Sequence, residues 1–166
     1  MRVALYTAAI DDRYGKGVIK SRIGLEAEAN LFDANSPMYE PISKQHSEQK
    51  LSCVLVDEAQ FLTTVQVDEL ARLVDEKNLP VLCFGIRTDF QGQLFPGSSR
   101  LLAIADKLVE LKTVCDCGRK ATMTVRLDQA GKVVAAGDQV QIGGNERYES
   151  KCRRHYRELM QSVSEE

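Results

Sequence analysis

The sequence has no tryptophan and few aromatic residues of any kind, with five tyrosines and five phenylalanines in 166 residues. Basic side chains are not in excess either, since the formal net charge is −2 and the pI about 5.8. A nucleic acid polymer is bound chiefly through its phosphates by a basic surface, so this charge balance argues against such a partner. No apolar run approaches the roughly 18 residues that cross a bilayer, which argues against a membrane protein.

The start of the sequence lacks the pattern of a secretory signal peptide, because its apolar part is short and leads into Asp11 and Asp12. We therefore expect a cytoplasmic chain. In that compartment the five cysteines are expected to be reduced thiols or metal ligands rather than disulfides. The hydrophobic share of 43% and the charged share of 28% are ordinary for one globular domain, or for one domain with a small appendage.

The clearest pattern is the apolar run Cys53–Val56, which is followed directly by Asp57 and Glu58. A short, continuous apolar run is typical of a strand that is buried on both faces in a parallel sheet. Its carboxyl end is where open α/β sheets place their ligands. Two interpretations remain open. One carboxylate can hold Mg²⁺ beside a nucleotide while the other acts as a base, or the acids simply begin a helix.

A helix is predicted over 65–76, where apolar residues recur at helical spacing and Thr63 or Thr64 can cap the first turn. A second buried strand is predicted over 81–86. A strand, a helix and a strand in this order form a βαβ unit, so the two strands are expected to be parallel. With a further short strand over 3–6, the fold class is α/β with a parallel sheet.

The other stretches are less regular. Residues 18–40 show no sustained period and are interpreted as a long excursion from the core. A short helix is predicted over 42–50 and a strand over 107–111. From Cys115 onward, short alternating runs are broken by glycines, which predicts a small β subdomain closed by a helix over 153–161.

Four residues have the spacing of metal ligands: Cys115-x-Cys117, and much later Cys152-x-x-His155. Two close pairs of soft ligands can complete a tetrahedral Zn²⁺ site, and four protein ligands leave no open position. The metal is therefore expected to be structural and to hold together a subdomain too small to build its own core. The alternative is a set of unrelated thiols and a surface histidine.

Two further groups can form a binding site. Phe61, Phe90 and Phe95 flank the ends of the two central strands, where they either pack in the core or line a pocket for a flat ligand such as a nucleobase. The stretch 141–148 contains adjacent glycines, whose backbone can fold closely round a ligand and present bare N–H and C=O groups. An ordinary β-turn is the alternative.

A set of short motifs follows one another along the chain: Leu5-Tyr6-Thr7-Ala8, Asp11-Asp12-Arg13, Ser21-Arg22-Ile23-Gly24, Val56-Asp57-Glu58-Ala59-Gln60-Phe61, Arg87-Thr88-Asp89-Phe90, Cys115-x-Cys117, Ile142-Gly143-Gly144-Asn145-Glu146-Arg147-Tyr148 and Cys152-x-x-His155. Together they closely resemble those of the bacterial type II thymidine kinases, relatives of the animal cytosolic enzyme. The resemblance covers essentially the whole chain. Each motif alone is weak, but their combination is specific.

The resemblance implies phosphoryl transfer from ATP to the 5′-hydroxyl of thymidine, giving thymidine monophosphate for DNA precursor salvage. It implies a P-loop-type α/β core over 1–114 and a zinc-stapled β subdomain over 115–166 that carries a lasso loop. It also implies Mg²⁺ with ATP, a structural Zn²⁺ and a homotetramer.

By the same resemblance, Glu58 is the general base that takes the proton of the thymidine 5′-hydroxyl, and Asp57 holds Mg²⁺. The segment that contacts ATP is Asp57, Glu58, Ala59 and Gln60. Asp11 and Arg13 match a loop near the phosphates. 

The nucleoside and metal contacts follow in the same way. Phe61 and Phe90 match residues that line the thymine pocket. The lasso contacts to the nucleoside match Gln139, Val140, Gln141, Ile142, Gly143 and Tyr148. The zinc ligands match Cys115, Cys117, Cys152 and His155.

One motif of that family is missing. The family opens with a strand, a Gly-x-x-x-x-Gly-Lys-Ser/Thr loop and a helix, whereas here the early pair Gly15-Lys16 is followed by Gly17. We expect that a βα unit of roughly 30 residues is absent, and that its strand belongs beside the 53–57 strand. Because P-loop amides and the P-loop lysine carry most ATP phosphate binding, we expect the chain as written to be poorly soluble and without measurable kinase activity. The alternative is a non-catalytic, zinc-stapled nucleoside-binding fragment or a degenerate kinase.

Overall fold

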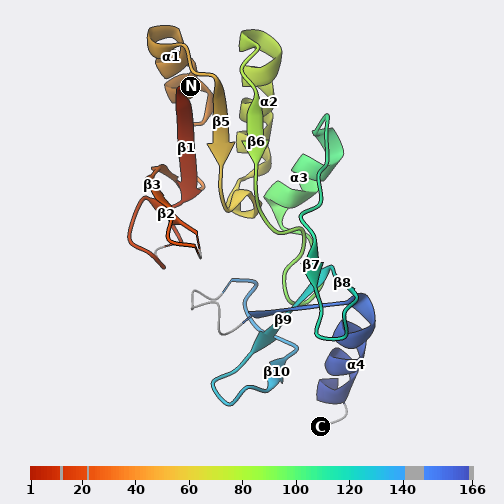
Figure 1. The fold of residues 1–166 in the computed structure, drawn as a ribbon. Helices are drawn as coiled ribbons and strands as arrows, with labels where there is room; N and C mark the ends of the chain where they lie inside the picture. Colours follow the sequence, from red (N-terminus) through yellow and green to blue (C-terminus); the bar gives the residue numbers. More distant parts are fainter. Residues whose placement is uncertain (12, 22, 141–147, 165–166) are drawn as a thin grey trace. The chain divides into compact units, whose positions relative to one another are not determined.

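The structure, a computed structural model drawn in Figure 1, describes most of the chain. The described residues are 1–11, 13–21, 23–140 and 148–164. No helix among them is long and apolar enough to cross a membrane.

The chain divides into two compact units, each made of two separate stretches of sequence. The first unit holds Met1–Arg87 and Phe95–Ile104, and the second holds Thr88–Leu94 and Ala105–Glu166. The short stretch Thr88–Leu94 thus belongs with the carboxyl-terminal part of the chain. The functional division at residue 114 stays a prediction.

The first unit is built on a four-stranded sheet in the order β4-β1-β5-β6, in which all neighbouring strands are parallel. Its strands are β1 (Val3–Ala8), β4 (Asn30–Phe32), β5 (Cys53–Val56) and β6 (Val81–Cys83). The α/β class and the parallel pairing of β5 with β6 are therefore confirmed. Strand β6 is shorter than the predicted 81–86.

Helix α2 (Thr64–Lys77) connects β5 to β6, as the apolar periodicity predicts. Thr63 caps it by accepting a hydrogen bond from the backbone N–H of Gln66, whose side chain in turn accepts one from the N–H of Thr63. The helix ends at Asn78, which adopts a left-handed conformation that stops the helical hydrogen-bond ladder. Figure 1 shows α2 alongside β6.

The stretch 18–40 has more regular structure than its sequence predicts. It forms the hairpin of β2 (Val18–Lys20) and β3 (Glu26–Glu28), and then β4, which lies at one edge of the sheet. The interpretation as an excursion without strands is therefore wrong. Each of these strands is only three residues long, too short for an apolar period to emerge.

Both sides of β5 are occupied in the sheet, by β1 on one side and β6 on the other. The expectation that a further strand belongs beside the 53–57 stretch is therefore wrong, because β5 has no free edge. Among the described residues β6 is the strand at that end of the sheet, and its neighbourhood exposes Leu82, Phe84 and Ile86 by 44%, 42% and 47%.

Three helical segments complete the first unit: α1 (Tyr39–Gln49), the 3₁₀ turn η1 (Ala59–Phe61) and α3 (Pro96–Ile104). The helix predicted over 42–50 is thus confirmed, with an earlier start. The core of this unit gathers side chains from the sheet and from the helices packed on it. Val54 and Val56 of β5 are fully buried there, as a central parallel strand requires.

The second unit contains a three-stranded antiparallel sheet, a small hairpin and a helix. Its elements are β7 (Thr113–Val114), β8 (Lys120–Ala121), β9 (Met123–Leu127), β10 (Val133–Val134), β11 (Tyr148–Lys151) and α4 (Arg153–Ser164). The predicted strand over 107–111 is wrong. That stretch pairs with no strand in the described part of the chain, and Leu108, Val109 and Leu111 are 61%, 68% and 75% exposed.

Candidate functional site

The turn after β5 is tied to β1 and to the residue that directly follows β6. The N–H of Asp57 donates to the carbonyl of Tyr6 at 2.8 Å, and the N–H of Ala59 donates to the carbonyl of Phe84 at 2.8 Å. Between them Glu58 adopts a left-handed conformation with φ of 52°. That conformation costs a residue with a side chain about 1–3 kcal/mol, and it is concentrated at functional sites, where the surrounding structure enforces it.

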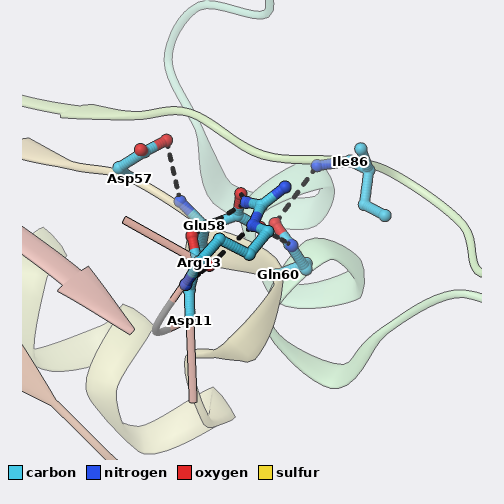
Figure 2. Close-up of polar contacts among 6 residues, drawn as sticks. All are labelled: Asp11, Arg13, Asp57, Glu58, Gln60 and Ile86. Atoms are coloured by element: carbon cyan, nitrogen blue, oxygen red, sulfur yellow. Dashed lines mark hydrogen bonds and ion pairs between the residues drawn. The ribbon is translucent and has the colours of Figure 1, made fainter. Parts of the chain in front are cut away.

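Glu58 is held through both of its carboxylate oxygens (Figure 2). Arg13 donates from Nη2 to Oε1 at 2.7 Å, and Gln60 donates from Nε2 to Oε2 at 2.5 Å. The Glu58 side chain is 24% exposed, so it remains open to a ligand. Each carboxylate oxygen has a second lone pair, and therefore either one can still accept a hydrogen bond from a substrate hydroxyl.

Gln60 is itself buried and fixed at both ends of its amide. Its Oε1 accepts from the backbone N–H of Ile86 at 3.2 Å, so its NH₂ group must face Glu58. A Cβ at position 85 would lie 2.5 Å from that Oε1, so a larger residue there would force the Gln60 amide to move. Gln60 therefore links the turn after β5 to the chain that follows β6.

Asp11 and Arg13 form a bidentate ion pair at the same place, with Nε to Oδ1 at 2.6 Å and Nη2 to Oδ2 at 2.8 Å. The hydrogen bond from Arg13 lowers the pKa of the Asp11 carboxyl. Asp57 behaves in the opposite way. Burial raises its pKa and the negative charge of Asp11 raises it further, against the hydrogen bond from the N–H of Glu58 and the charge of Arg13. A nearby cation would therefore be favourable for Asp57.

The second unit brings the four predicted metal ligands together. Cys115 and Cys117 lie at the β7–β8 turn, Cys152 directly precedes α4, and His155 is in its first turn. Their ligand atoms all lie within 4.8 Å of one another. The Sγ of Cys115 is 3.4 Å from Nδ1 of His155, and the Sγ atoms of Cys117 and Cys152 are 3.8 Å apart.

These distances fit zinc. A tetrahedron with zinc–sulfur bonds of about 2.3 Å has edges of roughly 3.8 Å, close to the two distances of 3.4 Å and 3.8 Å within the cluster. Backbone N–H groups of Cys117 and Cys152 lower the pKa of the Cys115 thiol to about 6. At neutral pH this thiol is ionised, which is the form that binds a metal. The cluster can therefore hold a structural metal such as zinc.

The predicted pocket residues are split between the two units. Phe61 belongs to the first, where its ring meets that of Phe95 edge to face at 5.9 Å between centroids. Phe90 belongs to the second and is 1% exposed. Their common role in one pocket stays a prediction.

Half of the predicted lasso contacts lie in the described part of the chain. Gln139 donates from Nε2 to Oδ2 of Asp89 at 2.9 Å, Val140 is half-buried, and Tyr148 begins β11. The predictions for Gln141, Ile142 and Gly143 lie outside the described residues.

Comparison with known proteins shows the family to which the chain with this carboxylate turn and this metal cluster belongs. A sequence model described as "Thymidine kinase" matches residues 1–156. The chain belongs to the thymidine kinase family. It is 59% identical to the thymidine kinase of Escherichia coli (strain K12) over 161 residues, which are 97% of this chain and 78% of that protein. It is also 59% identical to the thymidine kinase of Shewanella oneidensis over 160 residues, 96% of this chain and 83% of that protein.

Membership of the thymidine kinase family confirms the resemblance seen in the motifs. A third relative, the thymidine kinase of Aliivibrio fischeri, is 58% identical over 160 residues, 96% of this chain and 83% of that protein. The three alignments cover nearly all of this chain, so both the carboxylate turn and the metal cluster lie within the matched region.

Three residues of the second unit were missed from the sequence. Arg126 is buried against Phe90, Tyr156 donates a hydrogen bond to the Phe90 carbonyl, and Asp89 is buried with Gln139 as a partner. A buried arginine inside an alternating strand has no distinct sequence pattern, because alternation assigns it to a face without saying what covers that face. Of the three, only Tyr156 has a sequence feature that could have suggested a role, because it directly follows the predicted metal ligand His155.

Proposed function

We propose that the chain binds thymidine and that its carboxylate turn serves phosphoryl transfer from ATP to the thymidine 5′-hydroxyl. Family membership supports this reaction class. The single observation that carries it is Glu58, which sits at the carboxyl end of a central parallel strand with both oxygens held in place and a quarter of its side chain exposed. Open α/β sheets bind their ligands at this edge.

Glu58 is the proposed general base. The thymidine 5′-oxygen would attack the γ-phosphorus of ATP, its proton would pass to a Glu58 oxygen, and the bond from the γ-phosphorus to the bridging oxygen would break to release ADP. Such transfer depends on positioning more than on covalent chemistry. The hydrogen bonds from Arg13 and Gln60 supply that positioning, since they prevent the carboxylate from rotating away.

The charges around this turn suit a phosphate ligand. Asp57 is the proposed ligand of Mg²⁺, and this ion would neutralise phosphate charge when bound with ATP. The raised pKa of Asp57 fits this role, because a bound cation would offset the cost of burying its negative charge. Arg13 places a cation next to Glu58, in position to contact a phosphoryl group. Ala59 and Gln60 belong to the proposed ATP-contacting segment by family resemblance alone, because both are buried and the Ala59 N–H and the Gln60 side chain already bond within the protein.

The thymine side is proposed to be formed by Phe61 and Phe90, with the lasso loop reading the edge of the base. The loop contacts are those of Gln139, Val140, Gln141, Ile142, Gly143 and Tyr148. Zinc bound to the four-residue cluster would anchor the carboxyl-terminal end of this segment, because Cys152 follows β11 directly and Cys115 and Cys117 lie on the hairpin that neighbours β11. The family resemblance also leads us to propose a cytoplasmic homotetramer.

A second candidate function rests on one sequence observation. The printed sequence contains no Gly-x-x-x-x-Gly-Lys-Ser/Thr segment, the loop whose amides and lysine hold ATP phosphates. A chain with the nucleoside site alone would bind thymidine without phosphorylating it. Thymidine binding without phosphorylation is therefore the second candidate function of these 166 residues.

Both parts are tested on the purified 166-residue protein. Calorimetric titration with thymidine is expected to show saturable binding, with adenosine as the control ligand that does not bind. Incubation with radiolabelled thymidine, ATP and Mg²⁺ separates the two candidates, because only phosphoryl transfer yields thymidine monophosphate. Formation of the monophosphate would support the kinase and contradict the second candidate, whereas thymidine binding without the monophosphate would support the second candidate. Failure to bind thymidine would contradict both.

A further inference from the structure

Arg126 on β9 is a buried cation with an unusual set of partners. It is 5% exposed, and its guanidinium carbon lies 3.8 Å from the centroid of the Phe90 ring. Its Nη1 donates to the carbonyl oxygen of Asp138 at 2.8 Å, and its Nη2 donates to that of Ala136 at 3.2 Å. No described carboxylate pairs with it, and its buried Nε has no hydrogen-bond partner among the described residues.

This arrangement is not explained by stability. Removing a charge from water is costly, and the cost is normally offset by a counter-ion. Among the described residues, Arg126 meets a ring face and two neutral carbonyls, and its Nε has no partner there. Well-packed apolar residues would satisfy a purely structural position at least as well. The contacts of the guanidinium therefore indicate a positional task.

The contacts of the Arg126 side chain connect separate segments of the second unit. Phe90 lies on the Thr88–Leu94 stretch, whereas Ala136 and Asp138 lie on the segment that leads directly into Gln139. On its own sheet Arg126 is the direct cross-strand partner of Tyr148 on β11. Side chains that face each other across an antiparallel pair lie on the same side of the sheet. Arg126 thus stands among all three segments that carry the proposed nucleoside contacts of this unit.

The chain is shaped to admit this side chain. Gly137 has φ of +131°, and a Cβ there would lie 2.6 Å from Nη2 of Arg126. Any other residue would therefore push the guanidinium away from the 136–138 carbonyls as well as straining the backbone.

Two further contacts support the same stretch. The hydroxyl of Tyr156, on α4, donates to the carbonyl oxygen of Phe90 at 2.9 Å. The buried carboxylate of Asp89 accepts from Nε2 of Gln139 at 2.9 Å, and from the N–H groups of Gln91 and Gln93. Phe90 is therefore held by its ring, by its carbonyl and by its neighbour in sequence.

We propose that Arg126 and Tyr156 are positioning residues of the nucleoside site. Arg126 fixes the Phe90 ring relative to the segment entering the lasso, and Tyr156 fixes the Phe90 backbone relative to the helix that carries His155. Neither touches the reacting atoms; both set the affinity for the pyrimidine nucleoside by pre-ordering its contacts. This inference rests on the proposed function, because it assumes that Phe90, Gln139 and Tyr148 meet the nucleoside.

The test compares Arg126→Lys and Tyr156→Phe with the unaltered protein. Lysine keeps the charge but cannot stack flat and bridge two carbonyls, so thymidine affinity is expected to fall about tenfold. Loss of the tyrosine hydroxyl is expected to weaken it about fivefold. Zinc content should stay at the unaltered level in both variants, and hydrogen exchange should accelerate in peptides that cover 88–94.

The control substitutions lie on α4 and leave the network intact: Arg157→Lys, at an exposed arginine, and Ser162→Ala, which removes an exposed hydroxyl. Both should bind thymidine like the unaltered protein. If Arg126→Lys does not fold, Tyr156→Phe carries the test alone. Thymidine binding within about twofold of the unaltered protein, with unchanged exchange over 88–94, would overturn the inference while leaving the proposed function in place. If the unaltered protein binds no thymidine, the proposed function and this inference fall together.

Discussion

The side-chain amide of Gln60 donates to Oε2 of Glu58 at 2.5 Å while its carbonyl oxygen accepts from the N–H of Ile86. This pairing orients the amide, because the Ile86 N–H can only meet an acceptor. Glu58 must then present an acceptor to the NH₂ group, as an ionised carboxylate does. The Glu58 carboxylate is thus held in place by a residue that lies two positions further along the chain.

Replacing Glu58 by glutamine is expected to remove the selective recognition of the substrate hydroxyl. If Glu58 accepts a hydrogen bond from the thymidine 5′-hydroxyl, the unaltered protein should bind thymidine about tenfold more tightly than 5′-deoxythymidine, which lacks that group. In Glu58→Gln this ratio should fall toward one. Calorimetric titration of both ligands measures it, and an unchanged ratio would remove Glu58 as the group facing the hydroxyl. Glu48→Gln, at an exposed position on α1, is the control.

Gln60→Met tests whether the hydrogen bond from Gln60 positions the Glu58 carboxylate. Methionine has a similar length but no donor, so Glu58 loses one of its two hydrogen bonds and gains freedom to rotate. The affinity ratio between thymidine and 5′-deoxythymidine is expected to fall by about threefold, with affinity for 5′-deoxythymidine unchanged. Gly85→Ala should act in the same direction, because its Cβ would displace Oε1 of Gln60. Equal loss of affinity for both ligands would instead indicate a general collapse of the pocket.

Asp57→Asn is expected to stabilise the protein at neutral pH. Burial raises the folded-state pKa of this carboxyl, so ionisation disfavours the folded state. That penalty is fully present above the raised pKa and disappears below the unfolded value of 3.8. The asparagine variant should therefore show a Tm higher by roughly 2 °C near pH 7, with the difference shrinking as the pH approaches about 4.

The comparison for that prediction is Asp75→Asn, at an exposed position on α2. It should leave Tm unchanged across the same pH range, because its carboxylate is hydrated in both the folded and the unfolded state. A Tm for Asp57→Asn below that of the unaltered protein at neutral pH would show that the charge of Asp57 stabilises the fold. The prediction that ionised Asp57 destabilises the folded state would then be wrong.

The metal cluster predicts one Zn²⁺ per chain in metal analysis of the purified protein. Cys152→Ser should lose the ion and lower Tm, because three ligands and a hydroxyl bind zinc far more weakly than four soft or borderline ligands. Cys53→Ala, in the first unit, should retain full zinc content. Well under one zinc per chain, together with an unchanged Tm in Cys152→Ser, would contradict the four-ligand site.

Much of the first unit could be predicted because its local patterns agree with its packing. The apolar run Cys53–Val56 is a central strand, the period over 65–76 is a helix capped by Thr63, and both follow from burial. The metal cluster was equally accessible, since paired ligands at short spacing need only one folding event to meet. In each of these cases the pattern that predicts the structure lies in residues close together in the sequence.

The rest depends on partners distant in sequence. The edge strand Asn30–Phe32 has one buried side chain in three residues, so its existence follows from pairing with β1 and from nothing local. The apolar residues at 108, 109 and 111 suggest a strand, yet no described strand pairs with them. Arg126 is the extreme case, because its role is defined by a ring and two carbonyls contributed by other segments.

The second unit includes Thr88–Leu94, and so the backbone passes three times from one unit to the other. A polypeptide that starts at residue 105 would therefore keep its zinc ligands but lack Phe90, leaving the Arg126 guanidinium with nothing to stack on. A transplant that keeps the stack of Arg126 on Phe90 would therefore need Thr88–Leu94 as well as the stretch from Ala105 onward, and so more than one junction.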